Sequence, residues 1–189
     1  GVDSPYWCDT MYNIDFMGRI YPLNTYYAPE GYYFNHDIVD LPGSKMGALV
    51  TRKPAYRDYD QPLETSIAIY DNYGLVEIID INQYFDQSTQ INKNSLPGDM
   101  HFNTIEYYQP TNEIIANSRS TNGTYGFNLA TGELDWVYNT EAGENQIVKD
   151  KQLTVKNPDS YHSTSGQHTA LIDTNYTNTA EQFYISSYD

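Results

Sequence analysis

The 189-residue chain is poor in cysteine and in basic residues, and it contains no long apolar run. Cys8 is its sole cysteine, which excludes an internal disulfide bond and metal sites built from several cysteines. Only 10 Lys and Arg residues stand against 25 Asp and Glu residues, for a formal net charge of −15. Such a chain repels nucleic acid and anionic membrane, so we expect neither as a partner. No segment is apolar over the length of a membrane span, and no signal peptide is recognisable.

The residues that are abundant favour β-structure. Twenty tyrosines, together with many Ile, Val and Thr residues, are typical of strands. No long stretch has the apolar periodicity of a helix. Residues 82–99 and 139–167 are polar and lack a strand pattern, so we expect them to be connections between strands.

Three of the four histidines open similar segments, which indicates an internal repeat. The segments are HDIVDL (36–41), HFNTIEY (101–107) and HTALID (168–173). The intervals between successive histidines are nearly equal, 101 − 36 = 65 and 168 − 101 = 67. A nearly constant period indicates an array of equivalent units, and a ring of such units brings equivalent positions together. We therefore expect His36, His101 and His168 to converge on one site.

Each repeat contains two predicted hairpins. After each histidine segment, a turn containing Pro, Gly or Asn leads to a second β-rich run. A further hairpin turns at Gly18, Gly74 and Gly132, and the intervals between these glycines are again nearly equal, 74 − 18 = 56 and 132 − 74 = 58. Units of four strands with this period are typical of β-propeller blades. The alternative is a β-sandwich whose turns coincide with the period.

We predict an all-β fold, namely a partial β-propeller of about three four-stranded antiparallel blades that forms a single domain over residues 1–189. Propellers close with about four to eight blades, so we expect the chain to be a fragment of a larger protein. The open ends of such a fragment expose strand edges and apolar faces. The fragment is therefore expected either to self-associate as a homo-oligomer, with two copies completing a ring of six blades, or to be less stable than the whole protein.

The predicted site can be extended by counting across each hairpin. Each histidine and one residue of the next strand lie at equal distances in sequence from the turn between them, so we expect these two residues to lie opposite each other. The expected pairs are Arg52 with His36, Arg119 with His101, and Tyr188 with His168. His162 falls outside the repeat, in a loop rich in Ser and Thr, and we expect it to be a solvated loop residue.

The chemistry of this cluster favours an anionic ligand. Three imidazoles could bind zinc, but neighbouring arginines repel a cation, so we expect no metal at this site. Imidazole beside guanidinium suits an anion with several oxygens, such as a phosphate or sulfate ester. A neutral histidine can also act as a nucleophile, while the cations stabilise charge on the transferred group. The alternative is that these residues only line a polar channel.

Several segments resemble a known family. They are NHDIVDLP (35–42), DMHFN (99–103), EIIANSR (113–119), NLATGELDW (128–136) and GQHTA (166–170). These segments resemble bacterial arylsulfate sulfotransferases, the family that is independent of an activated nucleotide sulfate donor. The resemblance runs from about Tyr6 to the end of the chain. Its most specific parts are the His-x-Asn block with its following Ser-Arg, and the Gln-His-Thr-Ala block.

The resemblance implies a six-bladed propeller whose central active site moves a sulfuryl group from a phenolic sulfate ester to a phenol by a ping-pong route. It implies that His168 is transiently sulfated, that His36, His101 and Arg119 support the transfer, and that Asn103 contacts substrate. Arg52 and Tyr188 are added as substrate-binding residues by repeat symmetry alone. The resemblance also implies no cofactor and an extracytoplasmic location.

Two departures from the family pattern affect these expectations. Met100 stands where the family often has a bulky aromatic residue or Leu, which we expect to affect the fit of the acceptor. The remaining blades and an N-terminal domain are missing, so the isolated fragment is expected to be inactive. The alternative function is a non-catalytic propeller module that binds anionic or aromatic ligands or a protein partner.

Overall fold

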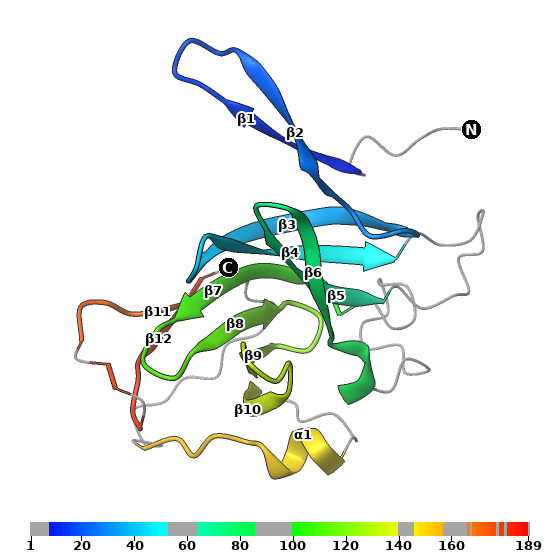
Figure 1. Cartoon of the computed structure of the whole chain (residues 1–189). Coiled ribbons are helices and arrows are strands. Elements are labelled where there is room, and N and C mark those ends of the chain that lie inside the picture. Colours follow the sequence, from blue (N-terminus) through cyan, green and yellow to red (C-terminus); the bar gives the residue numbers. More distant parts are fainter. Residues whose placement is uncertain are drawn as a thin grey trace.

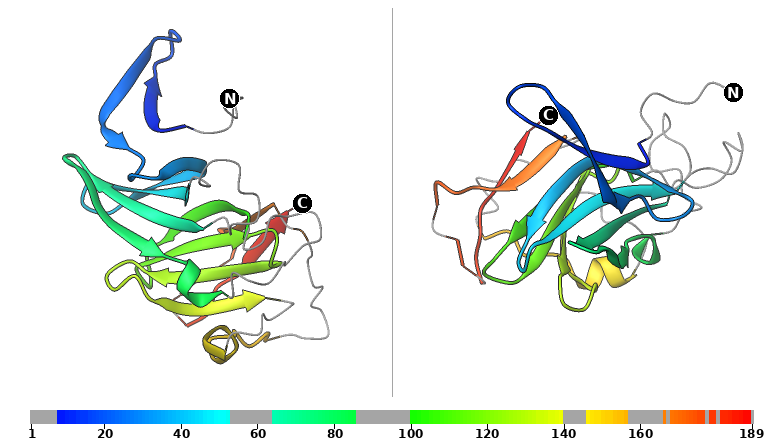
Figure 2. Two further views of the ribbon diagram at one scale, coloured as in Figure 1. Left: turned by 90° about the vertical axis from the view of Figure 1, so that its right-hand side faces the viewer. Right: turned by 45° about the horizontal axis from the view of Figure 1, so that its top comes forward.

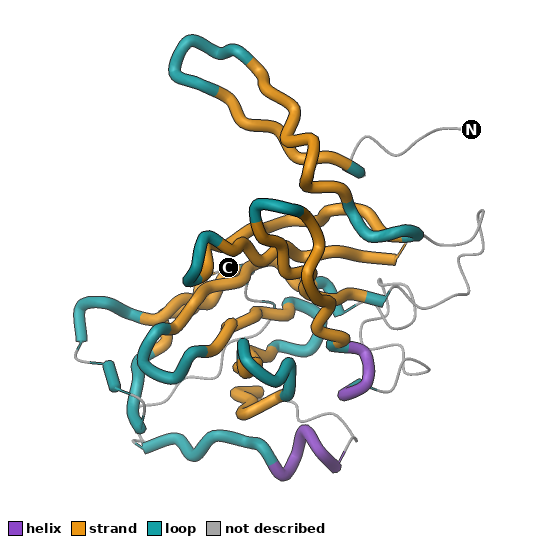
Figure 3. Tube along the Cα trace, in the orientation of Figure 1, coloured by secondary structure: helices purple, strands orange, loops and turns teal. Residues whose placement is uncertain are grey.

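The structure is a computed structural model, and almost all of its regular structure is strand (Figures 1 and 3). It describes residues 8–52, 64–85, 100–139, 146–156, 166, 168–176, 178–179 and 181–188. These residues form twelve strands in four antiparallel sheets, with one short helix and one 3-10 turn. The prediction of an all-β fold is confirmed. Among the described residues, no helix is long and apolar enough to cross a membrane.

The strands follow one another as hairpins along the chain. They are β1 (Thr10–Ile14), β2 (Ile20–Tyr27), β3 (Tyr32–Leu41), β4 (Lys45–Arg52), β5 (Thr65–Asp71), β6 (Gly74–Asp80), β7 (Phe102–Tyr108), β8 (Glu113–Ser118), β9 (Gly123–Asn128), β10 (Leu134–Asn139), β11 (Thr169–Ile172) and β12 (Ile185–Tyr188). The 3-10 helix η1 (Asn82–Tyr84) follows β6, and the helix α1 (Gln146–Asp150) follows β10. The turns predicted at Gly18, Gly74 and Gly132 join β1 to β2, β5 to β6 and β9 to β10.

Two of the four sheets are complete four-stranded meanders. Their strand orders are β3-β4-β5-β6 and β7-β8-β9-β10, and the remaining sheets are the hairpins β1-β2 and β11-β12. Each sheet pairs neighbours in the chain, and most of these neighbours are joined by short turns, which favour antiparallel hairpins. The strands β3, β7 and β11 therefore each form the first edge of a sheet, and each follows or carries one of the repeated histidines.

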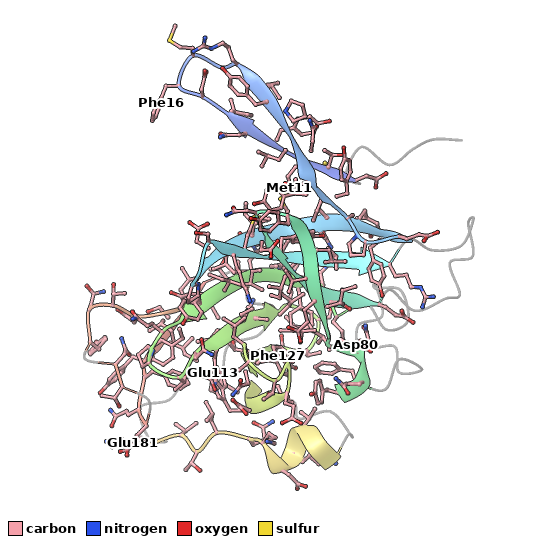
Figure 4. All side chains as sticks on the ribbon, viewed as in Figure 1. Met11, Phe16, Asp80, Glu113, Phe127 and Glu181 are labelled. Atoms are coloured by element: carbon pink, nitrogen blue, oxygen red, sulfur yellow. The ribbon has the colours of Figure 1, made fainter. Side chains whose placement is uncertain are left out.

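The main core lies between the two four-stranded sheets. Leu49, Ile67 and Ile69 of the first sheet belong to the same buried cluster as Tyr125 and Phe127 of the second. Phe127 is labelled in Figure 4. The central strands β4, β5, β8 and β9 are buried along nearly their whole length. Removing such a side chain from water contributes about 1.5–3 kcal/mol each, so contact between the sheets is the main source of stability.

The β1–β2 hairpin stands away from this core (Figures 1 and 2). Its side chains Ile14, Phe16 and Met17 are exposed at its far end, although each is apolar. Exposed apolar surface of this kind is typical of an interaction face. Association of the chain with itself, or a loss of stability in isolation, stays a prediction, and this hairpin is the surface on which we expect it to depend.

A second core joins the β7–β10 sheet to the β11–β12 hairpin. Tyr108, Ile115, Trp136 and Ile172 form this cluster. The indole of Trp136 lies over the backbone of Gly126, where an added Cβ would be 2.2 Å from the ring. A glycine is therefore required opposite the tryptophan that ends the NLATGELDW segment.

A buried carboxyl group, that of Glu113, borders this second core. Glu113 is 4% exposed, and its Oε2 accepts hydrogen bonds from Trp136 Nε1 at 3.0 Å and from the Thr111 hydroxyl. Burial raises the pKa of Glu113, although these two hydrogen bonds oppose the shift. The protonated acid is thus favoured in the folded state. The contribution of this protonated group to the stability of the fold is fully present at pH values below 4.5, the ordinary pKa of a glutamate side chain. It is lost as the pH rises through the higher pKa of the folded state.

Replacing Glu113 by Gln is expected to raise the free energy of unfolding at pH 7 by about 1 kcal/mol. The amide oxygen still accepts from Trp136, but no charge has to be buried. We expect the variant and the wild type to unfold alike at pH 4, as measured by urea denaturation at both pH values. Glu133→Gln, which changes an exposed carboxylate in the turn between β9 and β10, is the control. A less stable Glu113→Gln variant at pH 7 would contradict the argument.

Candidate functional site

The repeated histidines lie on strands that are neighbours in space. The edge strand β3 packs against β7, and β7 packs against β11, so the first edges of three successive sheets meet (Figure 1). His36 lies within β3, whereas His101 and His168 immediately precede β7 and β11. The predicted equivalence of the three positions therefore corresponds to adjacent strands in the structure.

His36 lies on an irregular part of β3. Phe34 pairs with Val50 and Ile38 pairs with Ala48, so three residues of β3 stand opposite one residue of β4. At this bulge His36 has a left-handed φ of 52° and an exposed side chain. Left-handed backbone is costly for residues other than glycine, and it is enriched at functional sites. The bulge turns the imidazole out of the regular alternation of the strand.

His101 shares this backbone feature and contacts His36. Its φ is 47°, and its ring centroid lies 5.2 Å from that of His36 with the ring planes 49° apart. The side chain is half-buried. Two histidines from different sheets therefore form one imidazole pair, as the repeat predicts.

Arg119 is held beside His101 through the backbone. The Arg119 N–H donates to the His101 carbonyl at 3.0 Å, so the predicted pairing of these two residues is confirmed. Hydrogen bonds of buried hydroxyl groups stabilise the turn after Arg119. Thr121 Oγ1 donates to Ser118 Oγ at 2.9 Å, and Ser118 Oγ donates to the Met100 carbonyl. The guanidinium group itself is exposed. A fixed backbone thus carries a cation that an anion can reach from solvent.

Asn103 is a buried polar side chain two residues after His101. It is 3% exposed, and neither its amide nitrogen nor its amide oxygen has a hydrogen-bond partner among the described residues. It occupies an extra position in β7, between the pairs of Phe102 with Ser118 and Thr104 with Asn117. Buried amides are normally paired, so this group is available to donate to or accept from a ligand.

His168 is exposed and directly precedes β11. Gly166, two residues before His168, is bonded to the turn that follows Arg119. The Gly166 N–H donates to Asn122 Oδ1, and the Asn122 N–H donates to the Arg119 carbonyl at 3.3 Å. These bonds place Gly166 beside the turn that follows Arg119.

The prediction that Arg52 lies beside His36 is wrong. Arg52 pairs with Tyr32 at the far end of β3, and its Nη1 donates to Glu64 Oε2 at 2.7 Å. This hydrogen bond raises the pKa of Arg52. The error has two sources. The β3–β4 hairpin is centred one residue earlier than the spacing indicates, and the bulge at His36 adds two residues to β3.

The predicted pairing of Tyr188 with His168 is also wrong, by one residue. Tyr188 pairs with Thr169 in the β11–β12 ladder. The pairs of this ladder, such as Ile172 with Ile185, are offset by one residue from those that the spacing indicates. His162 lies outside the described residues. Among the described residues, no three His, Cys, Asp or Glu side chains are close enough to hold a metal ion.

A groove of about 370 Å³ lies beside His36. Its walls come from the β1–β2 hairpin and from β3 and β4, and they are largely apolar: Met11, Leu23, Phe34 and Met46 line it together with Asn35 and Asp37. This volume is at the lower end of the range for small-molecule sites. The sequence does not indicate this groove, because the hairpin that forms one wall belongs to another sheet.

Two carboxylates at the site are also not indicated by the sequence. Asp37 Oδ2 accepts from Ile105 N–H at 3.0 Å, and Glu106 Oε2 accepts from Ile172 N–H at 2.7 Å. Both bonds join neighbouring edge strands. The only signal in the sequence is that one acidic residue directly follows His36 and another lies in the His101 segment.

Comparison with known proteins identifies a family for this chain. A family model described as Arylsulfotransferase (ASST) matches residues 4–189, which is nearly the whole chain. No curated protein matches the chain.

Proposed function

Because the chain belongs to the arylsulfotransferase family, we propose that it transfers a sulfuryl group from a phenolic sulfate ester to a phenol acceptor through a sulfohistidine intermediate. The observation that best supports this proposal is the His36–His101 ring pair, 5.2 Å between centroids, with Arg119 hydrogen-bonded to the backbone of His101. Imidazole and guanidinium groups in one place suit the several oxygens of a sulfate ester.

The proposed nucleophile is His168. In the first step a neutral imidazole nitrogen of His168 attacks the sulfur, the S–O bond to the aryl group breaks, and the phenol leaves with a proton from a protonated histidine. In the second step the acceptor phenol gives up its proton to that histidine, and its oxygen attacks the sulfur. The N–S bond then breaks and restores His168. No oxidant, reductant or cofactor is required.

The supporting residues have distinct proposed roles. We assign the binding of sulfuryl oxygens to Arg119, His101 and the buried amide of Asn103, because fixed donors stabilise the charge that develops on the transferred group. We assign proton exchange with the phenol to His36, which is exposed beside His101. Arg52 is left out of the proposed site, since Glu64 already binds its guanidinium group.

The aryl part of the substrate is proposed to lie in the groove beside His36. Aromatic ligands gain from contact with apolar and thioether side chains, and Met11, Phe34 and Met46 provide such contacts. The small volume of the groove favours a compact, single-ring phenol.

The four sheets are proposed to be consecutive parts of a propeller of six blades, in a single domain over residues 1–189. The contact between the first edge strands of successive sheets supports this arrangement, because the innermost strands of blades meet around a central channel. By likeness to the family we also propose an extracytoplasmic location, in the periplasm, at the cell surface or in the medium.

The proposal predicts transfer without any nucleotide. Incubation of the full-length protein with a chromogenic aryl sulfate and a phenol is expected to release the coloured phenol and to produce the sulfated acceptor, as followed by absorbance and mass spectrometry. Release should be much slower without the acceptor, because the sulfohistidine then has no partner. Binding of the aryl sulfate with no release of phenol would instead identify a binding module.

A further inference from the structure

Each edge strand at the site is bonded to the next one by a carboxylate. Asp37 on β3 accepts from the backbone of Ile105 on β7 at 3.0 Å, and Glu106 on β7 accepts from the backbone of Ile172 on β11 at 2.7 Å. Apart from side-chain packing, these bonds are direct links between the three strands associated with the histidines. They span 68 and 66 residues of sequence.

The two donors occupy the same position of the repeat. Ile105 lies four residues after His101, and Ile172 lies four residues after His168. Both are buried, at 4% and 7% exposure, and within the part of the chain that the structure describes both belong to strands with a ladder partner on one side only. A buried N–H on an unpaired edge needs a partner, and each carboxylate supplies it from the neighbouring strand.

Asp37 is constrained more closely than Glu106. Its Oδ2 accepts from Ile105, while its Oδ1 accepts from the N–H of Ile38 at 2.9 Å. Both oxygens therefore have donors, one on each of the two strands. Asp37 also directly follows His36 within the bulge, at the point where the backbone is left-handed. The side chain thus connects the irregular backbone of one histidine to the strand of the other.

We propose that Asp37 is a positioning residue that sets the separation and orientation of the His36–His101 ring pair, and that Glu106 does the same between β7 and β11 for His168. This inference rests on the proposed sulfuryl transfer for its functional consequence, but the geometry that it describes does not. Asp37 lines the groove proposed for the aryl group, but both of its oxygens accept from backbone N–H groups. Neither carboxylate is assigned any contact with the reacting atoms.

The bonding pattern distinguishes the two carboxylates. Both partners of Asp37 are N–H donors, so Asn at this position offers one acceptor and turns an NH₂ group towards the second donor. Glu106 has one such partner, and burial raises its pKa, although the bond from Ile172 lowers it. A neutral amide is therefore tolerated at Glu106 but not at Asp37.

The first test compares Asp37→Asn with Asp40→Asn in the full-length protein. Asp40 lies three residues further along β3 with an exposed side chain, so its variant removes the same charge from the same strand. We expect Asp37→Asn to lower kcat about 100-fold, as for a misplacement of reacting groups of about 1 Å, with KM changed less than about threefold. We expect Asp40→Asn and Glu106→Gln to retain wild-type kcat, and Glu106→Ala to lower it. Wild-type kcat in Asp37→Asn would overturn the proposal. The proposal would also be overturned if the loss of activity were no larger than the fraction of unfolded protein measured in a thermal melt.

The second test does not depend on activity. Imidazole resonances of the labelled protein are expected to shift for both His36 and His101 in Asp37→Asn, and for neither in Asp40→Asn. His101 is the informative residue, because it lies on a different strand from the substitution. If the wild type transfers no sulfuryl group, the proposed function fails while this measurement still decides the positioning role. An unchanged His101 resonance in Asp37→Asn would overturn that role.

Discussion

Replacing His168 by alanine is expected to reduce the rate of sulfuryl transfer by roughly 10⁴–10⁶-fold, the size of loss seen when a nucleophile is removed from an enzyme. Alanine has no nitrogen that can accept the sulfuryl group, so the covalent route is closed. The donor should still bind, because His101, Arg119 and Asn103 are unchanged. Steady-state release of the phenol, with the donor concentration varied, separates the loss of kcat from any change in KM.

The covalent intermediate gives a second measurement of the same prediction. A reaction with donor alone, quenched and digested, is expected to contain one sulfated peptide, which carries His168. His162→Ala, which removes a histidine six residues earlier in the chain, is expected to keep the wild-type rate and the same sulfated peptide. Full transfer activity in His168→Ala, or a sulfated peptide that lacks His168, would refute the assignment.

Replacing Arg119 by methionine is expected to lower kcat by roughly 10²–10³-fold, as for the loss of one fixed donor to a developing charge. Methionine keeps much of the length of the side chain and leaves the backbone hydrogen bond to His101 intact. Arg119→Lys should be intermediate, because an ammonium group keeps the charge but not the planar pair of donors. Rates of phenol release by the three proteins give this order.

The matched control for Arg119 is Arg19→Met. Arg19 is exposed on the β1–β2 hairpin, where it forms an ion pair with Asp15, and it lies outside the proposed site. Its loss removes the same formal charge from a chain whose net charge is −15. An equal fall in kcat for both variants would show that overall charge, rather than a contact by Arg119, is responsible.

The accuracy of the predicted pairs depends on where each hairpin is centred and on the bulges in its strands. Near the β7–β8 turn, Tyr108 pairs with Glu113, which is one residue out of step with the spacing. The extra residue Asn103 then brings Phe102 opposite Ser118, so Arg119 meets His101 as predicted. In β3 the spacing misleads, because the bulge at His36 adds residues that the sequence pattern does not reveal, and Arg52 is displaced to Tyr32. Alternation of side chains is sensitive to a shift of one residue, so an irregularity of this size changes which residues meet.

The strands, their turns and the repeat of the histidines can all be predicted from the amino-acid sequence. These features depend on local preferences: β-branched and aromatic residues favour extended backbone, and glycine or asparagine permits the turns. The nearly constant interval between His36, His101 and His168 then makes their positions equivalent, whatever the details of packing.

Which groups meet across the sheets depends on the packing of the folded chain. The hydrogen bond from the Ile105 N–H to Asp37, the hydrogen bond from the Gly166 N–H to Asn122 and the groove between Met11 and Met46 each join segments that are distant in sequence. Their physical cause is the same: an edge strand or turn leaves buried backbone groups or apolar surface unsatisfied, and the nearest segment of another sheet supplies the partner. Local preference does not specify that partner, because it depends on how the sheets pack.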